Sequence, residues 1–244
     1  MTDRPLAGRR ALITGGSRGI GAATARVLAH AGARVAVTAR TRPALDALVA
    51  ELNASCGAGH VSIAADLTTD PGMDAVVSQA RQWAGGAPDI IVNNAGSFVY
   101  ARIDEIPADE FARALRINLD APFRLVHAFL AAMRARRSGD IVTVGSVADH
   151  VAFTSNVAYN ASKFGLRAVH EVLRAETLGS GVRAILVSPA AVDTDVWTPL
   201  EAELGKTLPA RDAMLAPDDV ARAICFAVSQ PARVDIEELR IASS

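Results

Sequence analysis

The sequence predicts an α/β fold in which helices cover both faces of a parallel sheet of seven strands. Three observations support this prediction. Short runs of β-branched and aliphatic residues alternate with alanine-rich helical patterns along the 244 residues. The strand runs are apolar throughout, which is typical of parallel strands buried on both faces. A glycine-rich segment joins the first run to the first helical pattern, as in doubly wound sheets of the Rossmann type.

The elements follow one another in regular order. Seven runs bounded by turn residues are predicted to be strands: Arg10–Thr14, Arg34–Thr38, His60–Ala64, Ile90–Asn93, Ile141–Gly145, Ala184–Ser188 and Glu238–Ile241. Six segments between them have helical patterns: 20–31, 43–54, 72–84, 108–136, 156–179 and 217–229. Pro43, Pro71 and Pro217 fit first-turn positions of three of these helices. Right-handed crossovers then place ligand sites at the carboxyl ends of the strands.

The chain is expected to form a single domain over residues 1–244. Neither an internal repeat nor a linker rich in Pro, Gly or Ser divides it. One segment, about 190–216, lacks a helical or strand pattern and is longer than most loops of compact domains. Such loops are often lids over a site, and we expect a lid here.

Composition excludes several classes of protein. Lys+Arg at 25 and Asp+Glu at 26 give a net charge of −1, whereas a nucleic-acid binder normally carries a basic surplus. No apolar stretch approaches the ~18 residues of a membrane span, and the first residues lack the apolar segment of a secretory signal. Cys56 and Cys225 have no metal-type spacing. We expect a soluble, cytoplasmic protein with no metal, nucleic-acid or membrane partner.

The glycine-rich segment is suited to the phosphates of a dinucleotide. It reads Thr14-Gly15-Gly16-Ser17-Arg18-Gly19-Ile20-Gly21. Glycines allow the backbone to turn tightly and approach a pyrophosphate, and the following helix offers amide donors at its N-terminus. The spacing differs from the Walker pattern, which needs Gly-Lys-Ser/Thr. The predicted contacts from this segment are Gly15, Ser17, Arg18, Gly19, Ile20 and Gly21.

The end of the second strand predicts which dinucleotide binds. It reads Thr38-Ala39-Arg40, where an acidic residue would accept hydrogen bonds from a free 2′-hydroxyl of the adenosine ribose. Ala39 removes that carboxylate, while Arg40 and Arg18 can pair with a 2′-phosphate. NADP(H) is therefore favoured over NAD(H). The alternative is that both arginines are solvated surface residues.

A second motif predicts acid–base chemistry. Tyr159 and Lys163 lie four residues apart, and hence on one face of the predicted helix 156–179. A nearby cation favours the phenolate, which lowers the tyrosine pKa from about 10 and makes the phenol a usable proton donor or acceptor. Ser146 follows the strand 141–145, at the sheet edge that faces the cofactor. Its hydroxyl is placed to hydrogen-bond a substrate oxygen.

Together these motifs resemble the short-chain dehydrogenase/reductase family over roughly residues 8–241. The residues that carry the resemblance are Thr14–Gly21, Asn93-Asn94-Ala95-Gly96, Asn118, Ser146, Tyr159 and Lys163. The resemblance implies that Tyr159 exchanges a proton with the substrate oxygen and that Ser146 orients the carbonyl. It further implies that Lys163 lowers the phenol pKa and binds the nicotinamide ribose, and that Asn118 holds a relay water.

The resemblance also implies further cofactor contacts, beyond the glycine-rich segment and Arg40. These are Asp66, Leu67, Asn93, Ala95, Gly96, Tyr159, Lys163, Pro189, Val192 and Thr194. Two of the implied residues have a structural alternative. Asp66 fits a turn before the next helix, and Asn118 fits a helix bend.

The chain departs from the family pattern at two places. Pro189-Ala190 stands where the family usually has Pro-Gly, and alanine disfavours a positive φ. The C-terminus lacks the glycine-rich ending of many 3-oxoacyl-acyl-carrier-protein reductases, to which the chain is partly similar. Candidate substrate-wall residues are Phe98, Tyr100, His150, Phe153, Val157, Val192 and Trp197. The resemblance implies a homodimer or homotetramer formed through the helices near 108–136 and 156–179.

The sequence is thus interpreted as an NADPH-dependent oxidoreductase that acts on a carbonyl/secondary-alcohol pair, in the reductive direction. One alternative is a non-catalytic regulator that senses NADP(H) on the same fold. The intact Ser146, Tyr159 and Lys163 argue against it. Another is an NAD-linked alcohol dehydrogenase, which Ala39 and Arg40 oppose. The substrate is a small carbonyl compound or alcohol whose identity the sequence does not give.

Overall fold

The computed structural model describes residues 4–198 and 210–244, and it confirms the doubly wound α/β fold. All seven strands pair in parallel, in the order β3-β2-β1-β4-β5-β6-β7. The strands are β1 (Arg10–Thr14), β2 (Arg34–Ala39), β3 (Val61–Ala64), β4 (Ile90–Asn93), β5 (Gly139–Val144), β6 (Val182–Pro189) and β7 (Glu238–Ile241).

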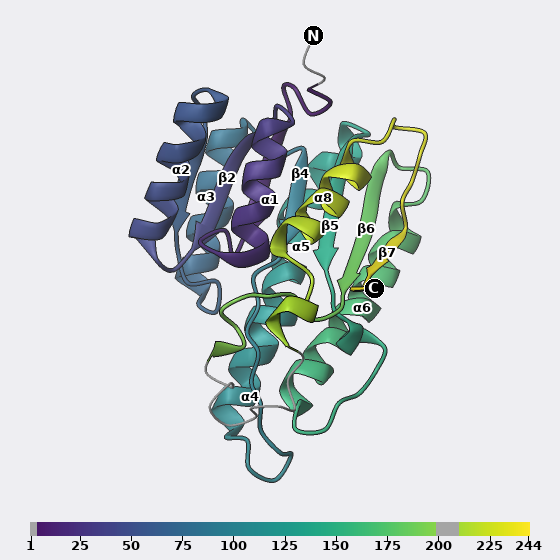
Figure 1. Cartoon of the computed structure of the whole chain (residues 1–244). Helices are drawn as coiled ribbons and strands as arrows, with labels where there is room; N and C mark the ends of the chain where they lie inside the picture. The colour runs from purple at the N-terminus through teal and green to yellow at the C-terminus, as the bar shows by residue number, and fades with distance from the viewer. Residues whose placement is uncertain (1–3, 199–209) are drawn as a thin grey trace.

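Helices connect these strands by crossovers (Figure 1). They are α1 (Gly19–His30), α2 (Arg42–Cys56), α3 (Asp70–Ala84), α4 (Ala108–Leu115), α5 (Ala121–Ala135), α6 (Val157–Thr177) and α8 (Pro217–Val228). Pro43, Pro71 and Pro217 stand in the first turns of α2, α3 and α8, as predicted. None of the helices within the described ranges is long and apolar enough to cross a membrane.

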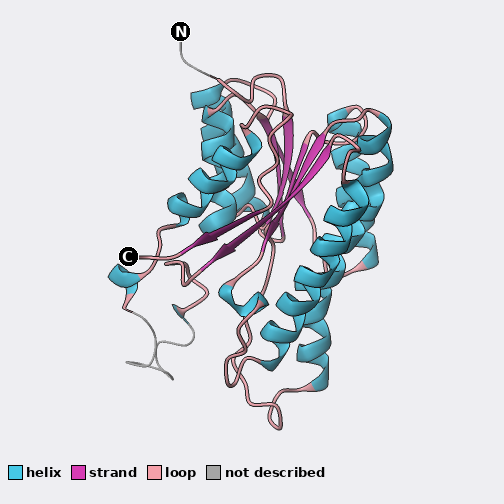
Figure 2. Ribbon diagram, turned by 90° about the vertical axis from the view of Figure 1, so that its right-hand side faces the viewer, coloured by secondary structure: helices cyan, strands magenta, loops and turns pink. Residues whose placement is uncertain are grey.

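Helices flank the sheet on both sides (Figure 2). One apolar core joins α1, α2 and α8 to the sheet, through residues such as Leu28, Leu45 and Ile224. The other joins α3, α5 and α6 to the opposite face, through residues such as Val76 and Phe129. Because both faces are covered, the strands must be apolar on both sides, which is why their sequences lack alternation.

The helical pattern predicted over 108–136 is interrupted by one π-helical turn, Arg116–Asp120, between α4 and α5. Pro122 lies at the start of α5 and has no amide hydrogen. The carbonyl of Asn118, four residues earlier, therefore has no α-helical donor. Single π turns of this kind often occur at functional sites.

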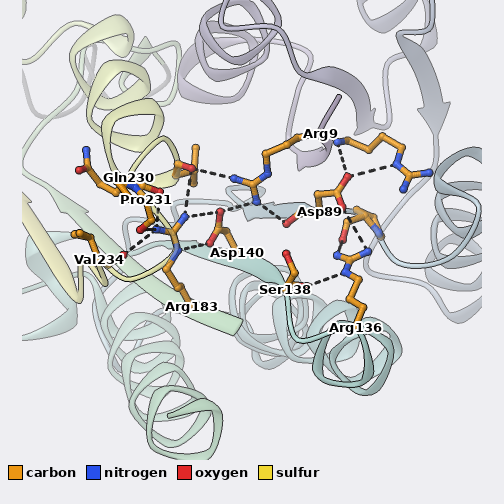
Figure 3. Close-up of polar contacts among 12 residues, drawn as sticks. Arg9, Asp89, Arg136, Ser138, Asp140, Arg183, Gln230, Pro231 and Val234 are labelled. Carbon is orange, nitrogen blue, oxygen red and sulfur yellow. Dashed lines mark hydrogen bonds and ion pairs between the residues drawn. The ribbon is translucent and has the colours of Figure 1, made fainter. Parts of the chain in front are cut away.

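A cluster of charged side chains ties the amino ends of β1, β5 and β6 together (Figure 3). Asp140 on β5 is 2% exposed and accepts hydrogen bonds from Arg9 Nη2 at 2.7 Å and from Arg183 Nε at 2.6 Å. Arg183 also donates to the carbonyl oxygens of Gln230 and Val234, which follow α8. The cluster thus joins the end of α8 to the sheet, on the edge opposite the candidate site.

Replacing Asp140 with alanine is expected to destabilise the fold strongly. The substitution leaves two arginines with no carboxylate partner, and breaking a buried ion pair costs about 3–5 kcal/mol. Arg9 is 24% exposed, so we expect the lower value, about 3 kcal/mol, in urea unfolding. Glu51→Ala is the control, because the pair of Glu51 with Arg26 is 47% and 44% exposed. Such pairs contribute at most about 1 kcal/mol, and an equal loss for both variants would contradict the account.

Candidate active site

A cleft of about 1350 Å³ runs along the carboxyl ends of the strands. Its lining comes from the segment after β1, the ends of β2 and β3, the loops after β4 and β5, the start of α6, and the segment after β6. Three of the predicted catalytic residues, Ser146, Tyr159 and Lys163, line this cleft together with the glycine-rich segment. The structure therefore brings the two predicted motifs into one cavity.

The glycine-rich segment has glycines at positions where a side chain would collide with neighbouring backbone atoms. Gly15 has φ +67°, and a Cβ there would lie 2.9 Å from the Cα of Ala95. A Cβ on Gly21 would lie 2.2 Å from the carbonyl oxygen of Gly15. Arg18 precedes α1 without a side-chain cap, so the first amides of this helix are free for an anion. This cradle fits the pyrophosphate of a dinucleotide.

Thr14 and Asn94 lock the end of β1 to the end of β4. Thr14 Oγ1 accepts hydrogen bonds from the amides of Asn94 at 3.0 Å and Ala95 at 2.9 Å. Asn94 Nδ2 donates to the carbonyl oxygen of Thr14 at 2.8 Å. Asn94 lines the cleft. The predicted contact Asn93 does not: it is a buried residue of β4, and its side-chain amide has no hydrogen-bond partner.

The end of the cleft near β2 and β3 is rich in charge. Arg18 Nη1 lies 3.3 Å from Asp195 Oδ2, and both side chains are exposed. Arg40 lines the cleft and is also exposed. Asp66 Oδ1 accepts hydrogen bonds from the amide and hydroxyl of Thr68, at 2.9 and 2.7 Å. These bonds, with Arg40 and Arg113, hold the pKa of Asp66 below its ordinary value. Asp66 is thus both a turn residue and a lining residue.

The opposite end of the cleft holds the predicted acid–base group. Lys163 is buried and donates from Nζ to the Val144 carbonyl oxygen at 2.8 Å. Its Nζ lies 5.6 Å from the centroid of the Tyr159 ring. Ser146 caps a short 3₁₀ turn, Val147–Asp149, by accepting a hydrogen bond from the amide of Ala148. The Ser146 hydroxyl also acts on the Tyr159 phenol, whose pKa it lowers.

Burial dominates the protonation of this pair. It raises the pKa of Tyr159, and the hydrogen bond from Ser146 only partly offsets that rise, while Asp149 adds to it. Burial also lowers the pKa of Lys163 to about 8, against the opposing effect of Asp149. The sequence predicted that the lysine lowers the pKa of the phenol; in this structure burial has the larger effect on the Tyr159 pKa and raises it.

Asn118 lies on the π turn and is fully buried. Its Nδ2 donates to the Ser97 carbonyl oxygen and to Ser162 Oγ, each at 2.9 Å, and its Oδ1 accepts from the Ser97 amide at 2.8 Å. The side chain is thus committed to protein partners. The main-chain carbonyl of Asn118 has no α-helical donor, because Pro122 lacks an amide hydrogen. This carbonyl is therefore the group of Asn118 that can bind a water.

Most predicted cofactor contacts line the cleft. They are Gly15, Ser17, Arg18, Gly19, Ile20, Arg40, Asp66, Leu67, Ala95, Gly96, Tyr159, Lys163, Pro189, Val192 and Thr194. Gly21, Asn93 and Asn118 do not line it. Gly21 instead allows α1 to begin close to the backbone of Gly15, because a side chain at this position would collide with the Gly15 carbonyl oxygen.

Aromatic side chains form the wall next to Tyr159. The ring of Phe98 meets the ring of Tyr159 edge-on, with centroids 4.9 Å apart, and lies 5.5 Å from the ring of Trp197. Trp197 is fixed by a 2.9 Å hydrogen bond from Nε1 to the Val192 carbonyl oxygen. Tyr100 and Phe153 also line the cleft. Two other candidate wall residues, His150 and Val157, do not.

Only part of the predicted lid, 190–216, can be placed, because 199–209 lie outside the described residues. Its two described ends pair through a bridge between Val192 and Leu215. Ala190 has no positive φ, and its amide donates to the Ile241 carbonyl oxygen at 2.8 Å. Alanine is therefore unstrained where the family usually has glycine. Thr194 lies beside the glycine-rich segment, where a Cβ on Gly19 would come within 3.2 Å of its methyl carbon.

The sequence analysis missed Asp149, a buried carboxylate directly behind Ser146. Asp149 and Ser146 form a capping box, and the spacing Ser-x-x-Asp was a signal for it. That signal predicts the local turn. It gives no indication of the contacts that Asp149 makes with distant elements.

Comparisons with known proteins agree with this geometry. The family model for short chain dehydrogenases matches residues 9–205. Glycine betaine reductase ATRR of Emericella nidulans is 35% identical over 240 residues, which are 97% of this chain but only 19% of that protein. D-threitol dehydrogenase of Mycolicibacterium smegmatis is 36% identical over 94% of this chain and 89% of its own length. The crystal structure of L-sorbose reductase from Gluconobacter frateurii, complexed with NADPH and L-sorbose, has a TM-score of 0.89 and 27% identity, covering 99% and 97% of the two chains.

Proposed function

Because the chain belongs to the short-chain dehydrogenase/reductase family, whose members here are oxidoreductases acting on CH–OH groups, we propose that it is an NADPH-dependent reductase. It reduces a ketone or aldehyde and, in reverse, oxidises the corresponding secondary alcohol. The observation that carries the proposal is that Tyr159, with Ser146 and Lys163 beside it, lines the same cleft as the glycine-rich cradle. We also propose that residues 1–244 form one domain, which their single sheet supports.

The residues around Tyr159 divide the work of the reaction. The nicotinamide, when bound, supplies the hydride for reduction. Ser146 Oγ holds the carbonyl oxygen of the substrate beside the Tyr159 hydroxyl, and Tyr159 donates its proton to that oxygen. Burial keeps the phenol protonated, which suits a proton donor in the reductive direction.

Lys163 and Asn118 resupply the proton. Lys163 Nζ donates to the Val144 carbonyl and keeps further hydrogens for the nicotinamide ribose and a water. We assign that water to the main-chain carbonyl of Asn118, since its side chain is already bonded to Ser97 and Ser162. Lys163 and this water would then return a proton to Tyr159, while Lys163 would also hold the ribose of a bound nicotinamide cofactor.

The charges at the other end of the cleft support NADP(H). Arg18 and Arg40 line it and no acidic residue stands at position 39, so a 2′-phosphate meets two guanidinium groups and no carboxylate at the ribose position. Arg18 shares its charge with the exposed Asp195 in the absence of the cofactor. The NADPH complex of L-sorbose reductase shows that this fold accepts that cofactor in a similar protein.

The double variant Ala39→Asp, Arg40→Leu is expected to prefer NADH. One charge-assisted phosphate contact is worth about 1.5–3 kcal/mol, so NADPH affinity should fall roughly tenfold to a hundredfold. Quenching of tryptophan fluorescence by each cofactor gives the dissociation constants. Arg42→Leu is the control, because Arg42 is exposed but does not line the cleft. Wild-type protein that binds NADH as tightly as NADPH would refute the assignment.

Measurements of turnover distinguish the proposed function from two other functions. A non-catalytic NADP(H) sensor binds the cofactor but reduces nothing, and an NAD-linked alcohol dehydrogenase works with NAD⁺ and alcohols. A panel of ketones, aldehydes, sugars and secondary alcohols, with NADPH oxidation or NADP⁺ reduction as the readout, tests all three. We expect NADPH oxidation with at least one carbonyl compound. The aromatic wall of Phe98, Trp197 and Phe153 favours carbonyl compounds with an apolar substituent within that panel.

We propose that the protein is a homo-oligomer, a dimer or tetramer. Each of the two long helices after β4 and β5 carries exposed apolar side chains. Phe123 on α5 is 47% exposed, and Phe164 and Val172 on α6 are 44% and 58% exposed. Large apolar residues exposed on neighbouring helices are typical of subunit contacts.

A further inference from the structure

Behind the candidate active site lies a buried carboxylate that the proposed reaction does not use. Asp149 ends the short turn that Ser146 begins, and it is 1% exposed. Its Oδ2 accepts hydrogen bonds from Ser188 Oγ at 2.6 Å and from the Ser146 amide at 3.2 Å. Its Oδ1 lies 2.7 Å from His150 Nδ1. The carboxylate thus connects the Ser146 turn to the end of β6.

A second layer of charges holds Asp149 in place. Arg167 on α6 lies 3.3 Å from Asp149 Oδ1 and forms two hydrogen bonds with Glu238 on β7, at 3.1 and 3.0 Å. Arg167 also lies 3.4 Å from Glu171, one turn further along α6. Asp149 is therefore bonded from three elements, namely its own turn, β6 and α6, and is linked through Arg167 to β7.

The space around Asp149 is closely filled. A Cβ on Gly145 would lie 2.4 Å from Asp149 Oδ2 and 2.8 Å from Ser188 Oγ. Glycine directly after β5 is thus what allows this carboxylate to approach the Ser146 backbone. Such a tight, buried group is costly unless it is fully bonded, and Asp149 has four partners.

We propose that Asp149 is a positioning residue, whose carboxylate fixes the Ser146 turn against β6, behind the cleft that Ser146, Tyr159 and Lys163 line. The proposal rests on the proposed reductase function, in which Tyr159 is the proton donor. It does not place Asp149 in contact with substrate or cofactor.

The directions of the pKa shifts support this role. Burial raises the pKa of Asp149, but hydrogen bonds from Ser188, His150 and the Ser146 amide, together with Arg167, bring it below its ordinary value. Asp149 is therefore ionised at neutral pH. Its charge raises the pKa values of both Tyr159 and Lys163.

Other titratable groups also lie around Asp149. His150 is on its own turn, Arg167 and Glu171 are on α6, and Glu238 is on β7. Arg167 lowers the pKa of Glu238 to about 2, so this carboxylate is also ionised. Burial lowers the pKa of His170 on α6 to about 4, so this ring is neutral in the working range.

Asp149→Asn removes the charge and keeps the shape and one of the two acceptor oxygens. Without the charge, Tyr159 and Lys163 lose their protons at lower pH. The alkaline limb of kcat/KM for reduction should therefore move to lower pH by about one pH unit, and so should the acid limb for oxidation, in which the Tyr159 phenolate is the base. A purely structural role would lower the rate and leave both limbs in place.

Two further variants test the direction in which charge moves the limbs of the pH profile. Glu171→Gln is the matched control, because it removes a carboxylate from the same arginine at a side chain that is 53% exposed and outside the cleft. Its limbs should stay within experimental error. Arg167→Gln removes a positive charge, so its limbs should move to higher pH. Folding of each variant is checked by circular dichroism, and Arg167→Gln tests the same charge effect if Asp149→Asn does not fold.

A spectroscopic titration tests the inference without activity. The chain has two tyrosines, Tyr100 and Tyr159, so the tyrosinate absorbance lost in Tyr159→Phe belongs to Tyr159. In Asp149→Asn this component should appear at lower pH than in the wild-type protein. If it appears at the same pH and the limbs are also unmoved, the inference is wrong. If the wild type turns over no substrate while the titration shifts, the proposed function fails and Asp149 keeps its role.

Discussion

Tyr159→Phe is expected to lower kcat for carbonyl reduction by about 10²–10⁴-fold, the usual contribution of general acid catalysis. The substitution keeps the ring, and with it the edge-on contact with Phe98 at 4.9 Å, but removes the hydroxyl whose pKa Ser146 lowers. Steady-state kinetics with NADPH and the best substrate of the panel provide the measurement.

NADPH binding serves as the internal control for this variant. The glycine-rich cradle and Arg40 are untouched, so the dissociation constant of NADPH should stay within a few-fold. Tyr100→Phe is the matched variant, because Tyr100 is the other tyrosine and lines the same cleft. It should retain most of the activity. Equal losses in the two tyrosine variants would show that the cleft wall, and not the Tyr159 proton, had been tested.

Lys163→Arg is expected to lose activity nearly as severely, by at least about 10²-fold. Lys163 is 6% exposed, and its ammonium donates to the Val144 carbonyl at 2.8 Å. A guanidinium is larger, planar and unable to give up its proton, so it fits neither this space nor a proton relay. Burial has lowered the pKa of Lys163 to about 8, which a relay near neutral pH can use.

The pH profile distinguishes a relay from a simple positive charge. If Lys163→Arg kept wild-type turnover across about pH 6 to 9, the lysine would contribute charge alone. The relay through Lys163 and Asn118 would then be wrong for this protein. Binding of NADPH to the variant, measured in parallel, shows whether the loss lies in catalysis or in cofactor affinity.

The sequence predicted the sheet well because its strands are bounded by local signals. β1, β4 and β7 begin and end at the predicted residues. β5 begins at Gly139, two residues before the predicted start. Gly139 and Asp140 do not fit an apolar run, and the pairing of Asp140 with Arg9 and Arg183 comes from distant segments.

Local spacing also predicted the centre of the site, because Tyr159 and Lys163 lie on one helix. What it could not predict depends on packing. Burial raises the Tyr159 pKa, and burial is a property of the whole fold. Asp149 acquires its role from Ser188 and Arg167, which are 39 and 18 residues away. Pro122 explains why Asn118 lies on a π turn, but only once the helix around it is known.

The central claim is that this cleft transfers hydrogen from NADPH to a carbonyl carbon. The most direct measurement uses NADPH deuterated at C4 of the nicotinamide, incubated with wild-type protein and the carbonyl panel, with the products examined by mass spectrometry. The account predicts an alcohol that carries deuterium on the former carbonyl carbon with wild-type protein, and at least about 10²-fold less with Tyr159→Phe. Protein that binds NADPH but delivers deuterium to no member of the panel would contradict it.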